Sequence, residues 1–179
     1  MYPKMTLVWR SIPSQLAREN KKFLYQTVKE GARAREYEYA LQWLVDAGLL
    51  HKIYRTKKTG LPLSAYDDVS AFKLYTADIG ILRRLSKLAP SVFAQGSRLF
   101  TEFNGALSEN FVLQSLVHQY DVIPRYWTDE QGKYEVDFII QHDNIILPVE
   151  VKAGINTQSP SLKKYTQQHG EQTPIRILF

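Results

Sequence analysis

The stretch 134–152 constrains the fold most, because two apolar runs flank a short polar segment there. The runs 134–140 and 145–152 enclose the tetrapeptide 141–144. This pattern is typical of two antiparallel strands joined by a loop. We therefore expect a β-hairpin with a four-residue loop.

The pairing register decides which side chains share a face, because successive side chains of a strand point to opposite faces. If Ile140 pairs with Ile145, Asp137 lies opposite Pro148. The second strand then has one purely apolar face, and a slip of one residue would bury charges. We expect four charged residues to share the other face: Glu135, Asp137, Glu150 and Lys152.

Crowded carboxylates on that face have two explanations, and the spacing alone leaves both open. Asp137 and Glu150 would be about 5–7 Å apart, with a repulsion on the order of 3 kcal/mol at an effective dielectric near 20. A divalent cation would relieve it, and oxygen ligands suit Mg²⁺ or Mn²⁺ rather than zinc. Alternatively, the face is solvated and Lys152 pairs locally with a glutamate.

Composition excludes several classes of site. The 179 residues suffice for one or two domains, and the absence of cysteine rules out disulfides, thiolate zinc sites and cysteine nucleophiles. A cysteine-free chain fits a reducing compartment, so we expect a cytoplasmic protein. No apolar run approaches the roughly 20 residues of a membrane span, so no membrane partner is expected.

Positive charge is concentrated in the first half, where residues 1–90 carry a balance of +8 against −3 for the remainder. Helical patterns up to residue 48 precede a strand at 49–55, a basic turn at 56–60 and a strand at 71–75, which is a winged-helix outline. Such domains bind DNA, or bind only proteins, or pack within their own chain. The DNA-contacting residues would be Lys52, Arg55, Lys57, Lys58 and, on a helix, Arg33.

The pattern also predicts three local features. Pro13 should break the first helical segment near Ser11. Thr76 is positioned to cap the helix after the second strand. Residues 88–100 have weak periodicity and should link a domain at 1–88 to one at 89–179.

A helix is predicted at 105–120, with Glu109 on the same side as its apolar stripe. A carboxylate facing a core needs a partner, because burying it unpaired costs several kcal/mol. Glu109 could therefore lie over the acidic hairpin face. Equally, it could be a boundary residue near the helix start, favoured by the helix dipole.

The order of Glu109 on a helix, Asp137 on one strand and Glu150-Val-Lys152 on the next resembles the PD-(D/E)XK nuclease superfamily, although Val136 stands where that motif has proline. Almost the whole chain also resembles the C-terminal half of a bacterial and archaeal AAA-type ATPase family that ends in a domain of unassigned function. The stretches that carry this second resemblance include Ala34-Arg-Glu-Tyr37, Phe72-Lys-Leu-Tyr75, Glu109-Asn-Phe-Val112 and Glu150-Val-Lys-Ala-Gly154.

These resemblances imply an α/β (α+β) chain: a winged-helix-like domain, then a restriction-endonuclease-like domain with a central mixed sheet flanked by helices. They imply that Asp137 and Glu150, with Glu109, ligate Mg²⁺ or Mn²⁺, and that Lys152 is the fourth catalytic residue. DNA would be the substrate or partner. Tyr165 and Gln167 are weaker candidates for substrate contact and are more readily explained as surface residues. The four histidines are interpreted as structural or surface residues.

The resemblance also implies an ATPase domain as partner, but the chain lacks a G-x-x-x-x-G-K-[ST] motif and so has no ATP site of that kind. We expect that the nuclease-like domain is truncated at its C-terminus. An alternative function stays open, that of a non-catalytic module that binds nucleic acid or protein and regulates the ATPase. Oligomerisation of the parent ATPase through the second half is a further option.

Overall fold

The computed structural model describes residues 2–18, 21–89, 91, 101–120, 122–152, 158–170 and 173–178. The chain forms two units, each assembled from two separate segments. The first unit contains residues 1–52 and 73–110, and the second contains residues 53–72 and 111–179. The fold is mixed α/β, as the sequence predicts.

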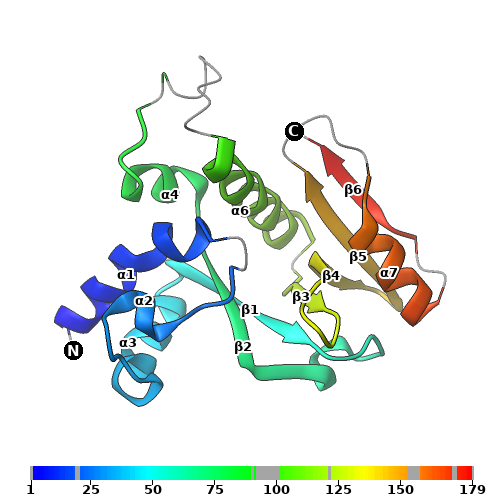
Figure 1. Ribbon diagram of the computed structural model, residues 1–179, viewed down its shortest axis with the longest axis horizontal. Coiled ribbons are helices and arrows are strands. Elements are labelled where there is room, and N and C mark those ends of the chain that lie inside the picture. Colours follow the sequence, from blue (N-terminus) through cyan, green and yellow to red (C-terminus); the bar gives the residue numbers. More distant parts are fainter. Residues whose placement is uncertain are drawn as a thin grey trace. The chain divides into compact units, whose positions relative to one another are not determined.

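Helices dominate the first unit (Figure 1). Helix α1 (Tyr2–Leu16) packs against α2 (Tyr25–Val28), α3 (Ala34–Asp46) and α4 (Ile79–Leu85). The buried side chains of α1 recur every three or four residues, the spacing that places them on one face of a helix. Together with α3 they form an apolar core that includes Val8, Ile12, Leu16, Leu41 and Leu44.

Two of the local expectations in this unit are wrong. Helix α1 continues through Pro13 to Leu16 and buries Ile12 and Leu16, so packing of this face offsets the backbone hydrogen bond that the proline removes. Helix α4 is capped by Asp78, whose side chain accepts hydrogen bonds from the N–H groups of Gly80 and Ile81. Thr76 instead donates its hydroxyl to the carbonyl oxygen of Asp78.

Six strands form one mixed sheet in the order β2-β1-β3-β4-β5-β6. Strands β1 and β3 pair in parallel, as do β5 and β6, whereas β3–β4 and β4–β5 are antiparallel. The expected wing strand β1 is thus hydrogen-bonded to β3 of the second half. The strand bounds are Leu50–Thr56, Asp67–Thr76, Arg125–Thr128, Glu135–His142, Ile145–Lys152 and Ile175–Leu178 for β1 to β6.

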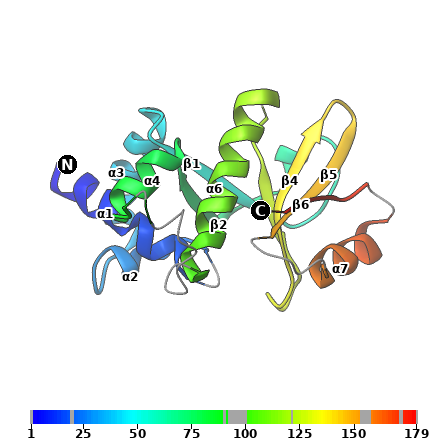
Figure 2. The same ribbon diagram turned by 90° about the horizontal axis from the view of Figure 1, so that it is seen from above.

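In the second unit, helix α7 (Pro160–His169) covers one face of the sheet. Its Leu162 and Tyr165 join a buried cluster with Trp127 of β3 and Ile139 of β4. The later turns of α6 (Thr101–Tyr120) lie along the opposite face of β4, β5 and β6 (Figures 1 and 2). Among the described residues, no helix is long and apolar enough to cross a membrane.

The link expected at 88–100 falls mostly outside the described residues. Other elements agree with the sequence patterns. Helix α3 ends where Gly48 adopts a φ of 68°, the left-handed conformation common after a helix C-terminus. Helix α6 also covers the range 105–120 where the periodicity predicts a helix.

Candidate functional site

The hairpin of β4 and β5 closes with a two-residue turn rather than the expected four-residue loop. His142 pairs with Ile145 and Ile140 with Leu147, so the expected register is wrong by two residues. Asp143 in the turn has a φ of 52°, the left-handed conformation that a two-residue hairpin turn needs. Because the shift is an even number of residues, the side chains keep the faces predicted for them.

The corrected register sets Asp137 level with Glu150 rather than with Pro148. The Oδ2 atom of Asp137 accepts a hydrogen bond of 2.8 Å from the backbone N–H of Val151. The ammonium group of Lys152 lies 2.6 Å from Oε1 of Glu150. Two carboxylates and one ammonium group therefore meet near the end of the hairpin strands, all within the second unit.

Glu150 is the unusual member of this group. Its side chain is only 2% exposed, and Lys152 contacts one of its two carboxylate oxygens. The other oxygen, Oε2, is buried and has no hydrogen-bond partner among the described residues. A buried acceptor without a partner costs about 1–3 kcal/mol, and more when the group is charged. A cation bound at this oxygen would remove that cost.

The donor set of Asp137 and Glu150 fits a hard cation, which is commonly held by one or two carboxylates with water and phosphate completing its shell. The carboxylate oxygens of these two residues would be the metal ligands, and Oε2 of Glu150 is one of them. No group of three or more histidine, aspartate or glutamate side chains gathers as a metal site within the described parts of the chain.

Glu109 is buried on α6 within the first unit, and its described contacts belong to that unit. Lys21 donates to its Oε1 at 2.5 Å, and the hydroxyl of Tyr75 donates to Oε2 at 2.9 Å. Burial raises the pKa of Glu109, but the positive charges of Lys21 and Lys73 and these hydrogen bonds outweigh it and lower the pKa. Glu109 therefore faces a core and has its partners there, whereas its placement over the acidic hairpin face stays a prediction.

The expected DNA-contacting residues differ in how far they are engaged. Arg55 is bound to the buried carboxylate of Asp68, and Nζ of Lys57 lies 3.9 Å from the same carboxylate. Lys58 and Arg33 are exposed, and Lys52 is half-buried. Arg33 precedes α3, and its backbone N–H donates to Oε2 of Glu36 in the first turn of that helix at 3.4 Å.

The weaker candidates on α7 separate clearly. Tyr165 is fully buried. Its ring centroid lies 5.3 Å from that of Trp127 in an edge contact and 4.7 Å from that of His169 in a tilted one. It is therefore a core residue, and the expectation of a surface residue is wrong for it because it lies on the helix face turned to the sheet. Gln167 is exposed. Burial lowers the pKa of His169, which fits the structural role expected for it.

A family model described as a domain of unknown function, DUF8612, matches residues 2–92. The chain belongs to the DUF8612 family. A second model, also described as a domain of unknown function, DUF4143, matches residues 104–177. No curated protein and no solved structure matches the chain.

Sequence reasoning did not identify Lys21 of this DUF8612 chain as the partner of Glu109. Lys21 lies 88 positions away from Glu109, and no periodic pattern links the two. The ion pairs of Asp67 with Arg125 and of Asp68 with Arg55 were missed for the same reason. A buried carboxylate on a helix face signalled that a cation was needed, but not which cation.

Proposed function

We propose that the chain is the nuclease-like, DNA-associated C-terminal region of an AAA-type ATPase, with a metal-dependent phosphodiesterase site at the end of the hairpin. The site consists of Asp137, Glu150 and Lys152. The observation that supports it best is the buried Oε2 of Glu150, which has no partner among the described residues. The winged-helix character of the first half, DNA as partner and an ATPase domain as neighbour are inferred from the resemblance.

The roles follow from the contacts. The N–H of Val151 donates to Oδ2 of Asp137, and this hydrogen bond fixes the orientation of the carboxylate. Asp137 and Glu150 would hold Mg²⁺ or Mn²⁺, which when bound lowers the pKa of water and polarises a phosphodiester. Lys152, whose side chain is 35% exposed, can stabilise negative charge that builds on the phosphate oxygens.

The proposal is tested by measuring Mn²⁺ binding calorimetrically and cleavage of supercoiled and linear DNA by the same preparation. Asp137→Asn and Lys152→Met should each lower the cleavage rate by about 100-fold or more, the usual effect of removing one electrostatic contact from a reacting centre. Asp137→Asn should also abolish saturable Mn²⁺ binding, because it removes one of two ligands.

Asp143→Asn is the matched control, because Asp143 lies in the turn of the same hairpin and the substitution removes the same charge. Asparagine tolerates the left-handed conformation at this position. Its cleavage rate and its Mn²⁺ binding should equal those of the wild type. Cleavage that survives Asp137→Asn, or that falls equally in Asp143→Asn, would refute the proposed site.

A second function, a binding or regulatory module without cleavage, is favoured by a different observation. Lys152 already neutralises Glu150, and Lys21 neutralises Glu109, so two of the three expected acidic residues have an internal counterion. This alternative predicts that DNA binding needs no metal and survives Glu150→Gln. Retention of a labelled duplex without any cleavage, in wild type and variant alike, would favour it over the phosphodiesterase.

A further inference from the structure

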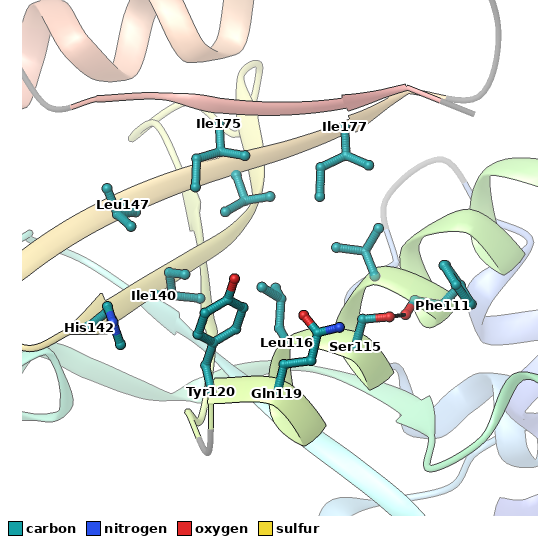
Figure 3. A pocket seen from close by; sticks show the side chains of 12 residues that line it. Phe111, Ser115, Leu116, Gln119, Tyr120, Ile140, His142, Leu147, Ile175 and Ile177 are labelled. Atoms are coloured by element: carbon teal, nitrogen blue, oxygen red, sulfur yellow. Dashed lines mark hydrogen bonds between the residues drawn. The ribbon is translucent and has the colours of Figure 1, made fainter.

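A largely apolar cavity of about 400 Å³ lies within the second unit, on the sheet face opposite α7 (Figure 3). Its volume falls in the range of roughly 300–1,000 Å³ that small-molecule sites occupy. It is separate from the acidic group: neither carboxylate nor Lys152 lines it.

The sheet side of the cavity is built by strict alternation. Each of the strands β4, β5 and β6 contributes two residues, spaced by two positions, so all six point to one face. Five of the six are aliphatic. They are Ile140, His142, Leu147, Val149, Ile175 and Ile177.

Helix α6 supplies the other wall with the matching periodicity. Its six lining residues are spaced by one, three, one, three and one positions, so they form a single face of the helix. Leu116 and Val112 are buried, whereas Phe111 is 44% and Tyr120 49% exposed. Large aromatic side chains left open beside an apolar cavity are the kind of surface that marks a binding site.

The polar groups gather toward one end of the cavity. The ring of Tyr120 lies 5.6 Å from that of His142 in an edge contact, and its hydroxyl points into the space, with Gln119 beside it (Figure 3). The hydroxyl of Ser115 donates within the helix to the carbonyl of Phe111. The other end is lined by Phe111 and Ile177, and the hydroxyl of Ser115 on that side is engaged by its hydrogen bond to Phe111.

Among the described residues that line the cavity, none is a lysine, arginine, aspartate or glutamate. A charged ligand would therefore lose its hydration without gaining a counterion from these residues, which disfavours its binding. A neutral hydrogen-bonding group, in contrast, can be matched by the hydroxyl of Tyr120 and the amide of Gln119. We propose that this cavity binds an uncharged amphiphile, with its polar head at Tyr120 and Gln119 and its apolar body between α6 and the β5–β6 strands.

The test is a fluorescence titration of the full chain with N-phenyl-1-naphthylamine, a neutral apolar probe, followed by competition. Saturable binding is expected. Displacement should occur with 1-decanol, and much less with decanoate or decylammonium of the same chain length. Gln119→Leu should weaken displacement by decanol about tenfold, the value of one hydrogen bond, while the probe itself still binds.

Two neighbouring residues of β6 give a matched pair of variants. Ile177→Trp fills the cavity and should abolish saturable probe binding, whereas Leu178→Trp, on the next position of the strand, should leave it unchanged because Leu178 does not line the cavity. Thermal unfolding of both variants is the control for folding. Ser115→Trp fills the cavity from the helix side if Ile177→Trp does not fold.

Three results would overturn the proposal: probe binding that does not saturate, equal loss of binding in the two β6 variants, or equal competition by all three decyl compounds. Sedimentation of the wild type adds a fourth. A dimer that forms with rising protein concentration and releases the probe would assign this face to a second copy of the chain instead.

Discussion

Lys21→Met is the most demanding test of the packing inside the first unit. It removes the ammonium group that lies 2.5 Å from Glu109, in a pair whose side chains are 15% and 7% exposed. Loss of one partner from a buried ion pair costs roughly 3–5 kcal/mol. The hydroxyl of Tyr75 still donates to Glu109 and the charge of Lys73 persists, so we expect the lower value, about 3 kcal/mol of unfolding free energy.

The assay is urea denaturation of the wild type, Lys21→Met, Glu109→Gln and the double variant. If the pair is coupled, the double variant should lose about 2 kcal/mol less than the two single variants together. Lys29→Met, at an exposed lysine in the same unit, should leave the stability unchanged.

The pH dependence gives a second readout. The native pKa of Glu109 is lowered, so its stabilising contribution is complete above the pKa of the unfolded chain and is lost as the pH falls through the native value. Lys21→Met raises that pKa. The deficit of the variant should therefore be largest near neutral pH and should shrink in acid. A cost below about 1 kcal/mol, as for an exposed pair, or strict additivity in the cycle would refute the reasoning.

Three further outcomes follow from contacts in the second unit. Burial raises the pKa of Asp68, but hydrogen bonds from Ser70 and Arg55 outweigh it and lower the pKa to about 2. The stability that Asp68 contributes is therefore lost as the pH falls from about 4 to 2. In Asp68→Asn the urea midpoint should depend less on pH over that window, and an unchanged pH dependence would contradict this. Asp143→Val forces a β-branched residue into the left-handed turn and should cost about 1–2 kcal/mol in urea unfolding, whereas Asp143→Gly should not. The N–H of Leu63 donates to the side-chain oxygen of Gln141 at 2.8 Å, and Gln141→Leu removes this acceptor. The free energy of unfolding should fall by about 1–3 kcal/mol and amide exchange at Leu63 should become faster. Unaltered exchange would argue against the contact.

Local patterns predicted the elements of the fold well. The alternation in 134–152 identified both hairpin strands, and helical spacing identified α3 and the later turns of α6. These signals are strong because one face of each element is buried. The turn of the hairpin was misjudged because Asp143 can adopt the left-handed conformation, which shortens the loop to two residues.

Long-range pairing could not be read from the same patterns. Nothing in the sequence near β1 indicates that it pairs in parallel with β3, about 70 residues later, since such ladders depend on the whole sheet. At the hairpin, alternation correctly placed Asp137 on the face of Glu150, because a two-residue error in register leaves faces unchanged. The counterion of Glu109 depended on tertiary contacts and was beyond prediction.

The discontinuous make-up of the second unit decides how the chain can be divided for experiments. A fragment that begins at residue 104, where the DUF4143 match starts, would omit residues 53–72 of that unit. It would lose Leu63 from the buried cluster around Trp127, and Asp67 from its bidentate contact with Arg125. Expressed alone, such a fragment should be poorly soluble, and a circularly permuted or co-expressed version that restores 53–72 should be the better behaved.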